Sequence, residues 1–325
     1  RHYWHTMLAR ILLVFALLGG CVGGHSDRPP LRLTVMFFNT YGAGVNDGKT
    51  MDETVAVIRA VNPDIVALGE VRAESDPCTA VCSATGPSRA PEIAAALGYS
   101  FYDQQQQNEA LWANAILSRY PITGSTANDL GVVINAADRQ VAMFGIHLTD
   151  YPYQPYQLLG IPYNGAPFLD TADAAIAAAT AARGPGLELL LQDLASVADV
   201  DAVFVAGDFN EPSHRDWTER AAAIGRHPLR VQYPTTLRLE SLGFVDTYRA
   251  VFPDEIEKPG YTWTPTTAVD DNDDHHDRID YIFMRAPAGR IESVFVVGEK
   301  SPEADIVVTS WPSDHRAVVA TVSIP

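Results

Sequence analysis

An acid and an amide stand two residues apart after a short apolar stretch in the second half of the chain. Residues 203–206 are all apolar, Gly207 follows them, and Asp208 and Asn210 come next. Because side chains alternate faces along an extended backbone, this spacing predicts that both polar groups point the same way. A carboxylate and an amide that emerge together from a buried strand suit a metal ion, a water molecule or a phosphate group. A plain turn is the alternative, since Gly, Asp and Asn all favour turns.

The same pattern, an apolar stretch with a polar side chain at its end, recurs along the chain. A lone histidine after an apolar strand is more often structural than catalytic, so no single occurrence identifies a site. Their recurrence favours one shared site at the edge of a sheet. The residues concerned are Asn39, Glu70, His147, Asp280, Asp314 and His315.

Buried strands and amphipathic helices must position these groups. Apolar runs of strand length alternate with segments of helical periodicity. No internal repeat and no linker after residue 30 divide the chain, which favours a single domain over residues 31–325. Strands interleaved with helices predict an α/β fold of two packed mixed β-sheets flanked by helices. Strands are expected at 31–38, 65–70, 99–102, 140–148, 291–297 and 317–324, a strand and turn at 113–122, and helices at 51–61, 91–97 and 187–198.

The order of the motifs resembles the endonuclease/exonuclease/phosphatase superfamily, which is deoxyribonuclease I-like. Gly207-Asp208-Phe209-Asn210 and the later Ser313-Asp314-His315 carry the resemblance, with the phrase Asn-Ala-Ile-Leu-Ser-Arg-Tyr-Pro-Ile at 114–122. The resemblance covers about residues 31–325. It implies a four-layer α/β sandwich and the metal-dependent hydrolysis of phosphate esters.

The resemblance also implies a metal site. It makes Glu70 the principal ligand, supported by Asn39 and Asp314. Hard carboxylate and amide oxygens suit Mg²⁺ or Mn²⁺, with Ca²⁺ as the alternative. The motif at Glu70 reads Gly-Glu here, where Gln-Glu is more usual in the family.

The catalytic roles implied by the resemblance fall on five residues. Asp208 would position or deprotonate the attacking water, and Asn210 would orient Asp208 or hold a phosphate oxygen. His315, held by Asp280, would act on the phosphate as a base or a stabiliser. His147 would be the second histidine, a phosphate stabiliser or proton donor. For the carboxylate that partners this histidine in some nucleases, the candidates are Asp103 and Glu109.

Four further residues are predicted to contact substrate: Asn114, Arg278, Tyr151 and Tyr153. Arg278 offers a fork for phosphate, although an ion pair with nearby acids explains it equally well. The two tyrosines belong to a segment at 150–186 that is rich in Tyr and Pro and then in Ala, with Gly184-Pro185-Gly186 before the next helix. Its aromatic part either forms a lid or substrate wall or packs on the scaffold as an insertion.

The N-terminus predicts export. Residues 1–21 read as a signal peptide, and Leu18-Gly19-Gly20-Cys21 resembles a bacterial lipobox, which would attach Cys21 to a membrane through lipid. A plain signal peptide is the alternative. Residues 22–30 form a polar tether, and we expect a bacterial periplasmic or cell-surface location. In an exported protein, Cys78 and Cys82 predict a small-loop disulfide, with free thiols or a partial metal site as alternatives.

Charge limits the substrate. The net charge is −17, which disfavours long nucleic acid because phosphate backbones are bound by clustered Lys and Arg. The acidic run at 270–277 is expected to be a solvated loop, with calcium binding as the alternative. We therefore expect a monomeric phosphodiesterase or phosphatase for small-molecule or lipid head-group esters. A secreted nuclease is the enzymatic alternative, and a non-catalytic surface binding module is the alternative from another class.

Overall fold

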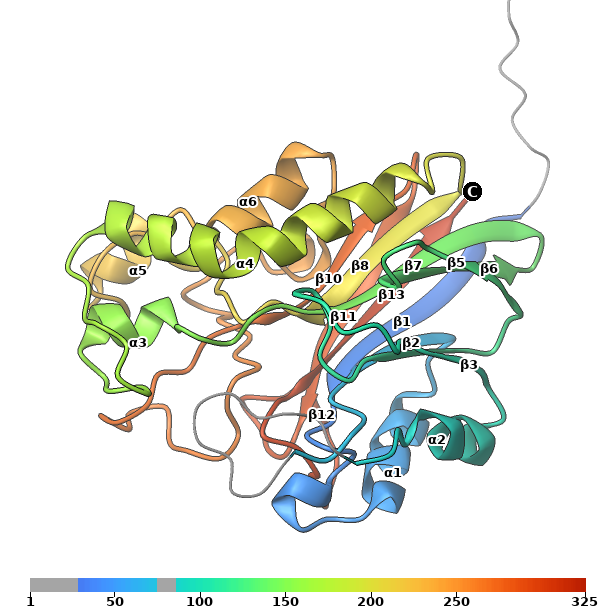
Figure 1. Cartoon of the computed structure of the whole chain (residues 1–325), viewed down its shortest axis with the longest axis horizontal. Coiled ribbons are helices and arrows are strands. Elements are labelled where there is room, and N and C mark those ends of the chain that lie inside the picture. Colours follow the sequence, from blue (N-terminus) through green and yellow to red (C-terminus); the bar gives the residue numbers. More distant parts are fainter. Residues whose placement is uncertain (1–28, 75–85) are drawn as a thin grey trace, which may run out of the picture.

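Two mixed β-sheets form the centre of the computed structural model, which describes residues 29–74 and 86–325 (Figure 1). The seven-stranded sheet runs β12 (Ile306–Val307), β11 (Arg290–Gly298), β13 (Ala317–Ile324), β1 (Leu31–Asn39), β2 (Ile65–Gly69), β4 (Ala115–Ser118) and β3 (Ser100–Asp103). The six-stranded sheet runs β5 (Ile122–Ser125), β6 (Gly131–Ala136), β7 (Arg139–His147), β8 (Ala202–Asp208), β10 (Asp280–Arg285) and β9 (Val245–Asp246).

The central strands are buried on both faces because each sheet is covered on both sides. In β1, Phe37 packs into the core between the two sheets, whereas Phe38 packs into the core beneath the helices. In β8, Phe204 faces the other sheet, and Val205 faces the helices on the outer side. Side chains alternate between the two cores, so these strands read as continuous apolar runs in the sequence.

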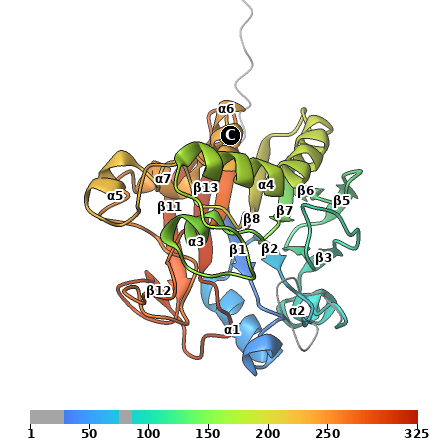
Figure 2. The ribbon, with the colours of Figure 1, turned by 60° about the vertical axis from the view of Figure 1, so that its left-hand side comes forward.

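Helices form the two outer layers (Figures 1 and 2). α1 (Met51–Val61) and α2 (Ala90–Leu97) cover the seven-stranded sheet, and α4 (Ala172–Ala195) and α6 (Pro234–Ser241) cover the six-stranded sheet. The predicted four-layer α/β sandwich is confirmed. The remaining helical elements are η1 (Val45–Asp47), α3 (Gln154–Leu159), α5 (Glu219–Ala223) and α7 (Thr247–Val251).

The register of the strands brings the polar strand ends together. β1 and β2 are parallel and pair Asn39 with Gly69, which places Glu70 one residue beyond. β7 and β8 are parallel and pair His147 with Asp208, and β10 runs antiparallel to β8 and pairs Asp280 with Asp208. Each polar residue therefore lies at the same edge of its sheet.

One predicted boundary is wrong. A helix was expected to begin at residue 187, after Gly184-Pro185-Gly186, but α4 begins at Ala172 and runs through these three residues without a break. Gly186 packs closely against the backbone of Glu109, and any larger residue would clash because a Cβ there would lie 2.3 Å from the Glu109 backbone oxygen. Both halves of α4 bury apolar side chains, such as Ala179 and Leu190, and this packing outweighs the local cost of an internal proline.

The predicted signal peptide, most of the tether and the Cys78–Cys82 pair lie outside the described residues. Within the described part of the chain, no helix combines the length and apolar character needed to cross a membrane.

Candidate active site

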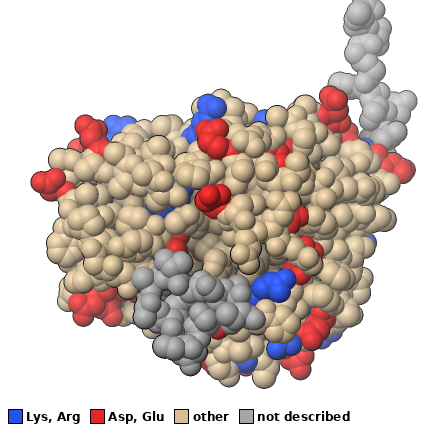
Figure 3. Space-filling view, in the orientation of Figure 1, with Lys and Arg blue, Asp and Glu red and all other residues tan. Residues whose placement is uncertain are grey.

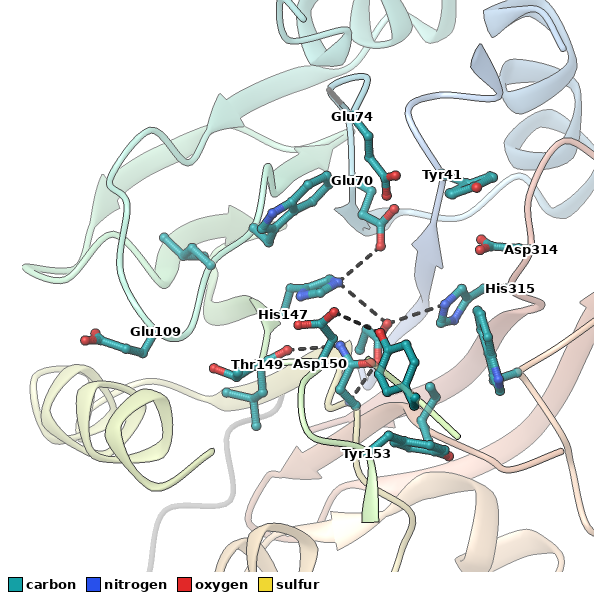
Figure 4. A pocket seen from close by; sticks show the side chains of 18 of the residues that line it. Tyr41, Glu70, Glu74, Glu109, His147, Thr149, Asp150, Tyr153, Asp314 and His315 are labelled. Atoms are coloured by element: carbon teal, nitrogen blue, oxygen red, sulfur yellow. Dashed lines mark hydrogen bonds and ion pairs between the residues drawn. The ribbon is translucent and has the colours of Figure 1, made fainter. Parts of the chain in front are cut away.

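A cavity of about 440 Å³ opens where the polar strand ends of both sheets meet. Figure 4 shows Glu70, His147 and His315 around this space, with Asp314 beside them. The predicted site residues that line the cavity are Glu70, His147, Tyr153, Asp208, Asn210, Asp314 and His315.

Asp208 lies at the centre of the polar groups. Its Oδ2 atom is 3.7 Å from Nε2 of His147 and 3.6 Å from Nε2 of His315. The same oxygen accepts a hydrogen bond of 3.1 Å from Nδ2 of Asn39. Its other oxygen accepts one of 2.8 Å from the backbone N–H of Asn210. Asp208 is 1% exposed, so these donors replace the water that would otherwise solvate its charge.

His315 is oriented by Asp280. Nδ1 of the ring lies 2.9 Å from Oδ2 of Asp280, and both residues are buried. Burial opposes a charged ring, but the negative charges of Asp280 and Asp208 outweigh it and raise the pKa of His315 well above its usual value. The ring is thereby held with Nε2 toward Asp208 and favours the protonated, donating form.

His147 is the second histidine and is paired with Glu70, with Nε2 of the ring 3.2 Å from Oε1. Burial opposes its charge, but the bond to Glu70 and the charge of Asp208 raise the pKa of His147 to about 9. Neither suggested nuclease-type partner bonds the ring. Asp103 is bound by Arg72 at 2.9 Å, and Glu109 points away from the ring in Figure 4.

Two of these residues have a left-handed backbone. Glu70 has φ of 53° and Asn210 has φ of 48°. Asn adopts this region readily, but Glu does not. The carbonyl oxygen of Glu70 accepts hydrogen bonds from the backbone N–H of Gly42 and from the Thr40 hydroxyl, at 2.8 and 2.9 Å. These bonds hold a strained turn that directs the carboxylate into the cavity, and such strain is common at functional sites.

Comparison with known proteins fits this arrangement. The sequence model described as "Endonuclease/Exonuclease/phosphatase family" matches residues 36–315. The chain belongs to the endonuclease/exonuclease/phosphatase family. It is therefore a hydrolase acting on phosphate ester bonds with the help of divalent metal.

A curated relative, "Uncharacterized protein F14F9.5" of Caenorhabditis elegans, is 28% identical over 332 residues, which cover 97% of this chain and 98% of the relative. An endonuclease/exonuclease/phosphatase family protein from Leptotrichia buccalis has a TM-score of 0.52 at 15% identity, covering 89% of this chain and 99% of its own. An AP endonuclease from Archaeoglobus fulgidus has a TM-score of 0.51 at 17% identity, covering 89% and 98%. These two structures share the fold.

The acidic groups of the site fit the divalent cation of the endonuclease/exonuclease/phosphatase family. Among the described residues, Oε2 of Glu70 and Oδ1 of Asp314 are buried without a hydrogen-bond partner. Burial and the nearby charge of Glu70 raise the pKa of Asp314, although His315 opposes this. These unpaired carboxylate oxygens belong to side chains whose negative charges repel each other, and a hard cation bound between them would stabilise both. One oxygen or nitrogen atom each from Glu70, His147 and Asp208 also lie within 4.8 Å of one another.

Asn39, the predicted supporting ligand of the metal, lies beside two of the carboxylates. Its Oδ1 atom accepts a hydrogen bond of 3.2 Å from the backbone N–H of Tyr41, so this oxygen is directed away from the carboxylates. Its Nδ2 atom donates to Glu70 at 2.8 Å and to Asp208 at 3.1 Å. In this arrangement Asn39 positions the two carboxylates through its nitrogen, and its role as a metal ligand stays a prediction.

The prediction that Arg278 contacts phosphate is wrong. The side chain is 2% exposed and does not line the cavity. Its guanidinium forms ion pairs with Asp216 at 2.9 Å and Asp246 at 2.8 Å. The structure confirms the alternative given for Arg278, an ion pair with nearby acids.

Of the three remaining residues that were predicted to contact substrate, one lines the cavity and two do not. Tyr153 lines the cavity, and its hydroxyl donates to Oδ2 of Asp277 at 2.7 Å. Tyr151 does not line it and donates instead to the backbone oxygen of Asn164 at 3.1 Å. Asn114 is fully buried outside the cavity, and its Oδ1 atom accepts from the backbone of Trp112 at 2.9 Å.

Sequence reasoning missed part of the cavity wall. Trp112 lies 5.9 Å from His147 between ring centroids, and Trp263 lies 4.9 Å from His315. Both tryptophans come from irregular segments whose sequence carries no strand or helix period. The only part of the aromatic wall that the sequence indicated is the Tyr-rich segment that begins at residue 150. From that segment, Tyr153, Tyr156 and Tyr163 line the cavity.

Proposed function

We propose that this chain is a Mg²⁺- or Mn²⁺-dependent phosphodiesterase or phosphatase for small or lipid head-group phosphate esters. The observation that carries the proposal is Asp208, buried between two histidine Nε2 atoms in a cavity that is also lined by Glu70 and Asp314, each with an unpaired carboxylate oxygen. A base, two cationic donors and a cation site in one cavity are the groups that phosphoryl transfer needs.

Glu70 and Asp314 would hold the cation. When bound, it supplies positive charge that offsets the charge developing on the phosphate oxygens. The left-handed turn at Glu70 keeps its carboxylate fixed before substrate arrives. The Nδ2 atom of Asn39 holds Oε1 of Glu70, which leaves Oε2 available to the cation.

Asp208 would accept the proton of the attacking water. Asn210 fixes it through its backbone N–H at Oδ1, while the Asn210 side chain donates to the backbone oxygen of Leu148 at 3.0 Å. Because its side-chain N–H serves Leu148, Asn210 acts here as a positioning residue, the first of its two predicted roles. Holding a carboxylate within hydrogen-bond reach of its target contributes a large share of catalysis in such sites.

The two histidines would donate to the phosphate and to the leaving oxygen. Each ring presents Nε2 toward Asp208, and nearby carboxylates raise the pKa of both rings. A protonated imidazole beside the reacting phosphate stabilises its negative charge, and the ring can also pass a proton to the departing alcohol.

The cavity wall favours a small ester with a neutral or cationic alcohol group. Among the described residues that line it none is Lys or Arg, whereas Tyr41, Tyr156 and Trp263 present rings and Glu74 and Asp150 present acids. Aromatic faces beside acids attract ammonium groups. On the described part of the face in Figure 3, Lys and Arg lie singly or in small groups among Asp and Glu and form no broad basic patch. Long nucleic acid is the less suitable substrate for such a surface.

We also propose that the enzyme works outside the cytoplasm as a monomer, exported by residues 1–21 and tethered through lipid on Cys21. The motif Leu18-Gly19-Gly20-Cys21 supports this. Mass spectrometry of the native N-terminus tests it, because lipid on Cys21 is expected and an unmodified start elsewhere would contradict the tether.

The central experiment measures hydrolysis of bis-p-nitrophenyl phosphate with Mg²⁺ or Mn²⁺. Asp208→Ala and His315→Ala should lose turnover while circular dichroism stays unchanged, and the exposed Asp170→Ala is the control that keeps it. Chelation should silence the wild type. Full turnover in either active-site variant, or turnover that resists chelation, would refute the mechanism.

A substrate panel then decides the class. Choline and glycerol phosphodiesters, sphingomyelin, nucleotides, phosphomonoesters and DNA are compared by kcat/KM. Preference for small or head-group esters supports the proposal, whereas preference for DNA supports the nuclease alternative, which the similarity to an AP endonuclease keeps in view.

A further inference from the structure

Two histidines and an aspartate converge behind the cavity wall, on segments that the reaction does not use. His227 follows α5, and His275 and Asp277 end the acidic run. Nδ1 of His227 lies 3.2 Å from Nε2 of His275, which lies 3.8 Å from Oδ1 of Asp277. Residues 270–273 of this run are exposed, as a solvated loop predicts, but Asp277 is 2% exposed. A buried acid facing two imidazoles is not explained by a solvated loop.

We propose that His227, His275 and Asp277 form a binding site for a transition-metal ion of the Zn²⁺ type. One ligand atom from each residue lies within 4.8 Å of the others. Ligands about 2.1 Å from a tetrahedral Zn²⁺ lie about 3.4 Å apart, which is close to the two shorter separations here. Two imidazole nitrogens and one carboxylate oxygen select Zn²⁺ or a similar metal over Mg²⁺ and Ca²⁺, which prefer oxygen.

The two ring nitrogens are suited to bind metal. Neutral imidazole is the form that coordinates metal. The His275 side chain is 15% exposed, which gives a path for the ion and a place for a water as fourth ligand.

Surrounding groups hold the ligands in place. The ring of Trp217 stacks on His227 at 4.2 Å between centroids with 11° between planes. Nε1 of the same tryptophan donates to Oδ1 of Asp277 at 2.9 Å, and the Tyr153 hydroxyl donates to Oδ2 at 2.7 Å. Hydrogen bonds of this kind to a ligating carboxylate are typical of metal sites.

A hydrogen bond between two neutral imidazoles is the metal-free explanation. It accounts for the 3.2 Å between His227 and His275. It does not account for the approach of Oδ1 of Asp277 to His275, because 3.8 Å to Nε2 is too long for a hydrogen bond and Trp217 already donates to this oxygen. A shared ion accounts for both separations.

The ion would brace the cavity wall. Asp277 exchanges two backbone hydrogen bonds with Trp263, at 3.0 and 2.9 Å, and its carboxylate holds Tyr153. Both of these aromatic residues line the cavity. The site is therefore structural, and its existence does not depend on which ester the enzyme hydrolyses.

The test counts zinc on the full folded chain. Metal-free protein is given equimolar ZnCl₂ with excess MgCl₂ to occupy the catalytic carboxylates, passed through a desalting column and analysed by mass spectrometry for metals. His275→Gln is the test variant, and His276→Gln is the matched control at the neighbouring histidine, whose Nε2 faces Thr267. We expect one bound zinc per chain in the wild type and the control, and loss of most of this zinc on desalting in His275→Gln.

A second background separates the two sites. Glu70→Gln removes a catalytic carboxylate and should leave the zinc count unchanged. Cobalt(II) added to this variant should give the strong visible absorption of a tetrahedral site, a measurement that needs no change at His275. Absence of retained zinc in the wild type, or zinc lost in Glu70→Gln and kept in His275→Gln, would overturn the proposal.

Discussion

Glu211, the residue after Asn210, carries a buried carboxylate whose effect on stability can be worked out. The side chain is fully buried, and Oε1 accepts a hydrogen bond of 2.8 Å from the backbone N–H of Thr235. Oε2 has no hydrogen-bond partner in the described residues. Burial raises the pKa of Glu211 from 4.5 to about 7, although the charge of Arg183 opposes this.

A raised pKa in the folded state makes the folded protein bind a proton more readily than the unfolded chain. The contribution to stability is therefore full below the unfolded value of 4.5 and is lost as the pH rises through about 7. The whole difference corresponds to about 3.4 kcal/mol at 1.36 kcal/mol per pH unit. Between about pH 5 and about pH 8 the free energy of unfolding should fall by about 2.5 kcal/mol from this group.

Glu211→Gln removes that dependence. Urea unfolding gives the free energy of unfolding of wild type and variant at both pH values. The difference between the two proteins isolates the effect of Glu211, because the other titrating groups contribute equally to both. We expect the variant to gain about 2.5 kcal/mol relative to wild type on going from about pH 5 to about pH 8. Glu219→Gln, an exposed residue of α5, is the control for loss of one charge. An equal wild-type-to-variant difference at both pH values would refute the reasoning.

Three further predictions concern the site and its support. Asp280→Asn should lower kcat by about 10²–10⁴ with little change in KM, because His315 loses its negative partner, and a change in KM alone would contradict this role. Gly186→Ala should destabilise by about 1–3 kcal/mol because its Cβ meets a facing backbone oxygen at 2.3 Å, whereas Gly184→Ala, with nothing nearer than 4.0 Å, should change stability by under about 1 kcal/mol in the same urea assay. Arg278→Met should cost about 3–5 kcal/mol by leaving buried acids with fewer cations, and unchanged stability would show that the ion pairs contribute nothing.

The sequence contains the layer order and most of the polar site because both depend on local patterns. The predicted bounds of α1 and β13 match the structure residue for residue, since apolar periodicity and a capping box around Thr50 mark α1 clearly. His315 and Asp280 were paired through the family resemblance, and the structure places them 2.9 Å apart.

The remainder depended on contacts between distant segments. β6 (Gly131–Ala136) was not predicted, although it pairs with β7 along its whole length. The continuous α4 follows from what its two halves bury, which Gly184-Pro185-Gly186 does not encode locally. Arg278 was ambiguous because the sequence does not reveal that Asp216 and Asp246 lie beside it.

The position of Asp208 between Asn39 and the two histidines means that the reaction centre is divided between the two sheets. Asn39 ends β1 and Glu70 directly follows β2 in the seven-stranded sheet, whereas His147 and Asp208 end β7 and β8 in the six-stranded sheet. A slip of one sheet against the other by about an ångström would separate these groups while leaving every helix and strand intact. Turnover is therefore a sensitive gauge of how the two sheets fit together, and on heating it should fade at a lower temperature than the circular dichroism signal.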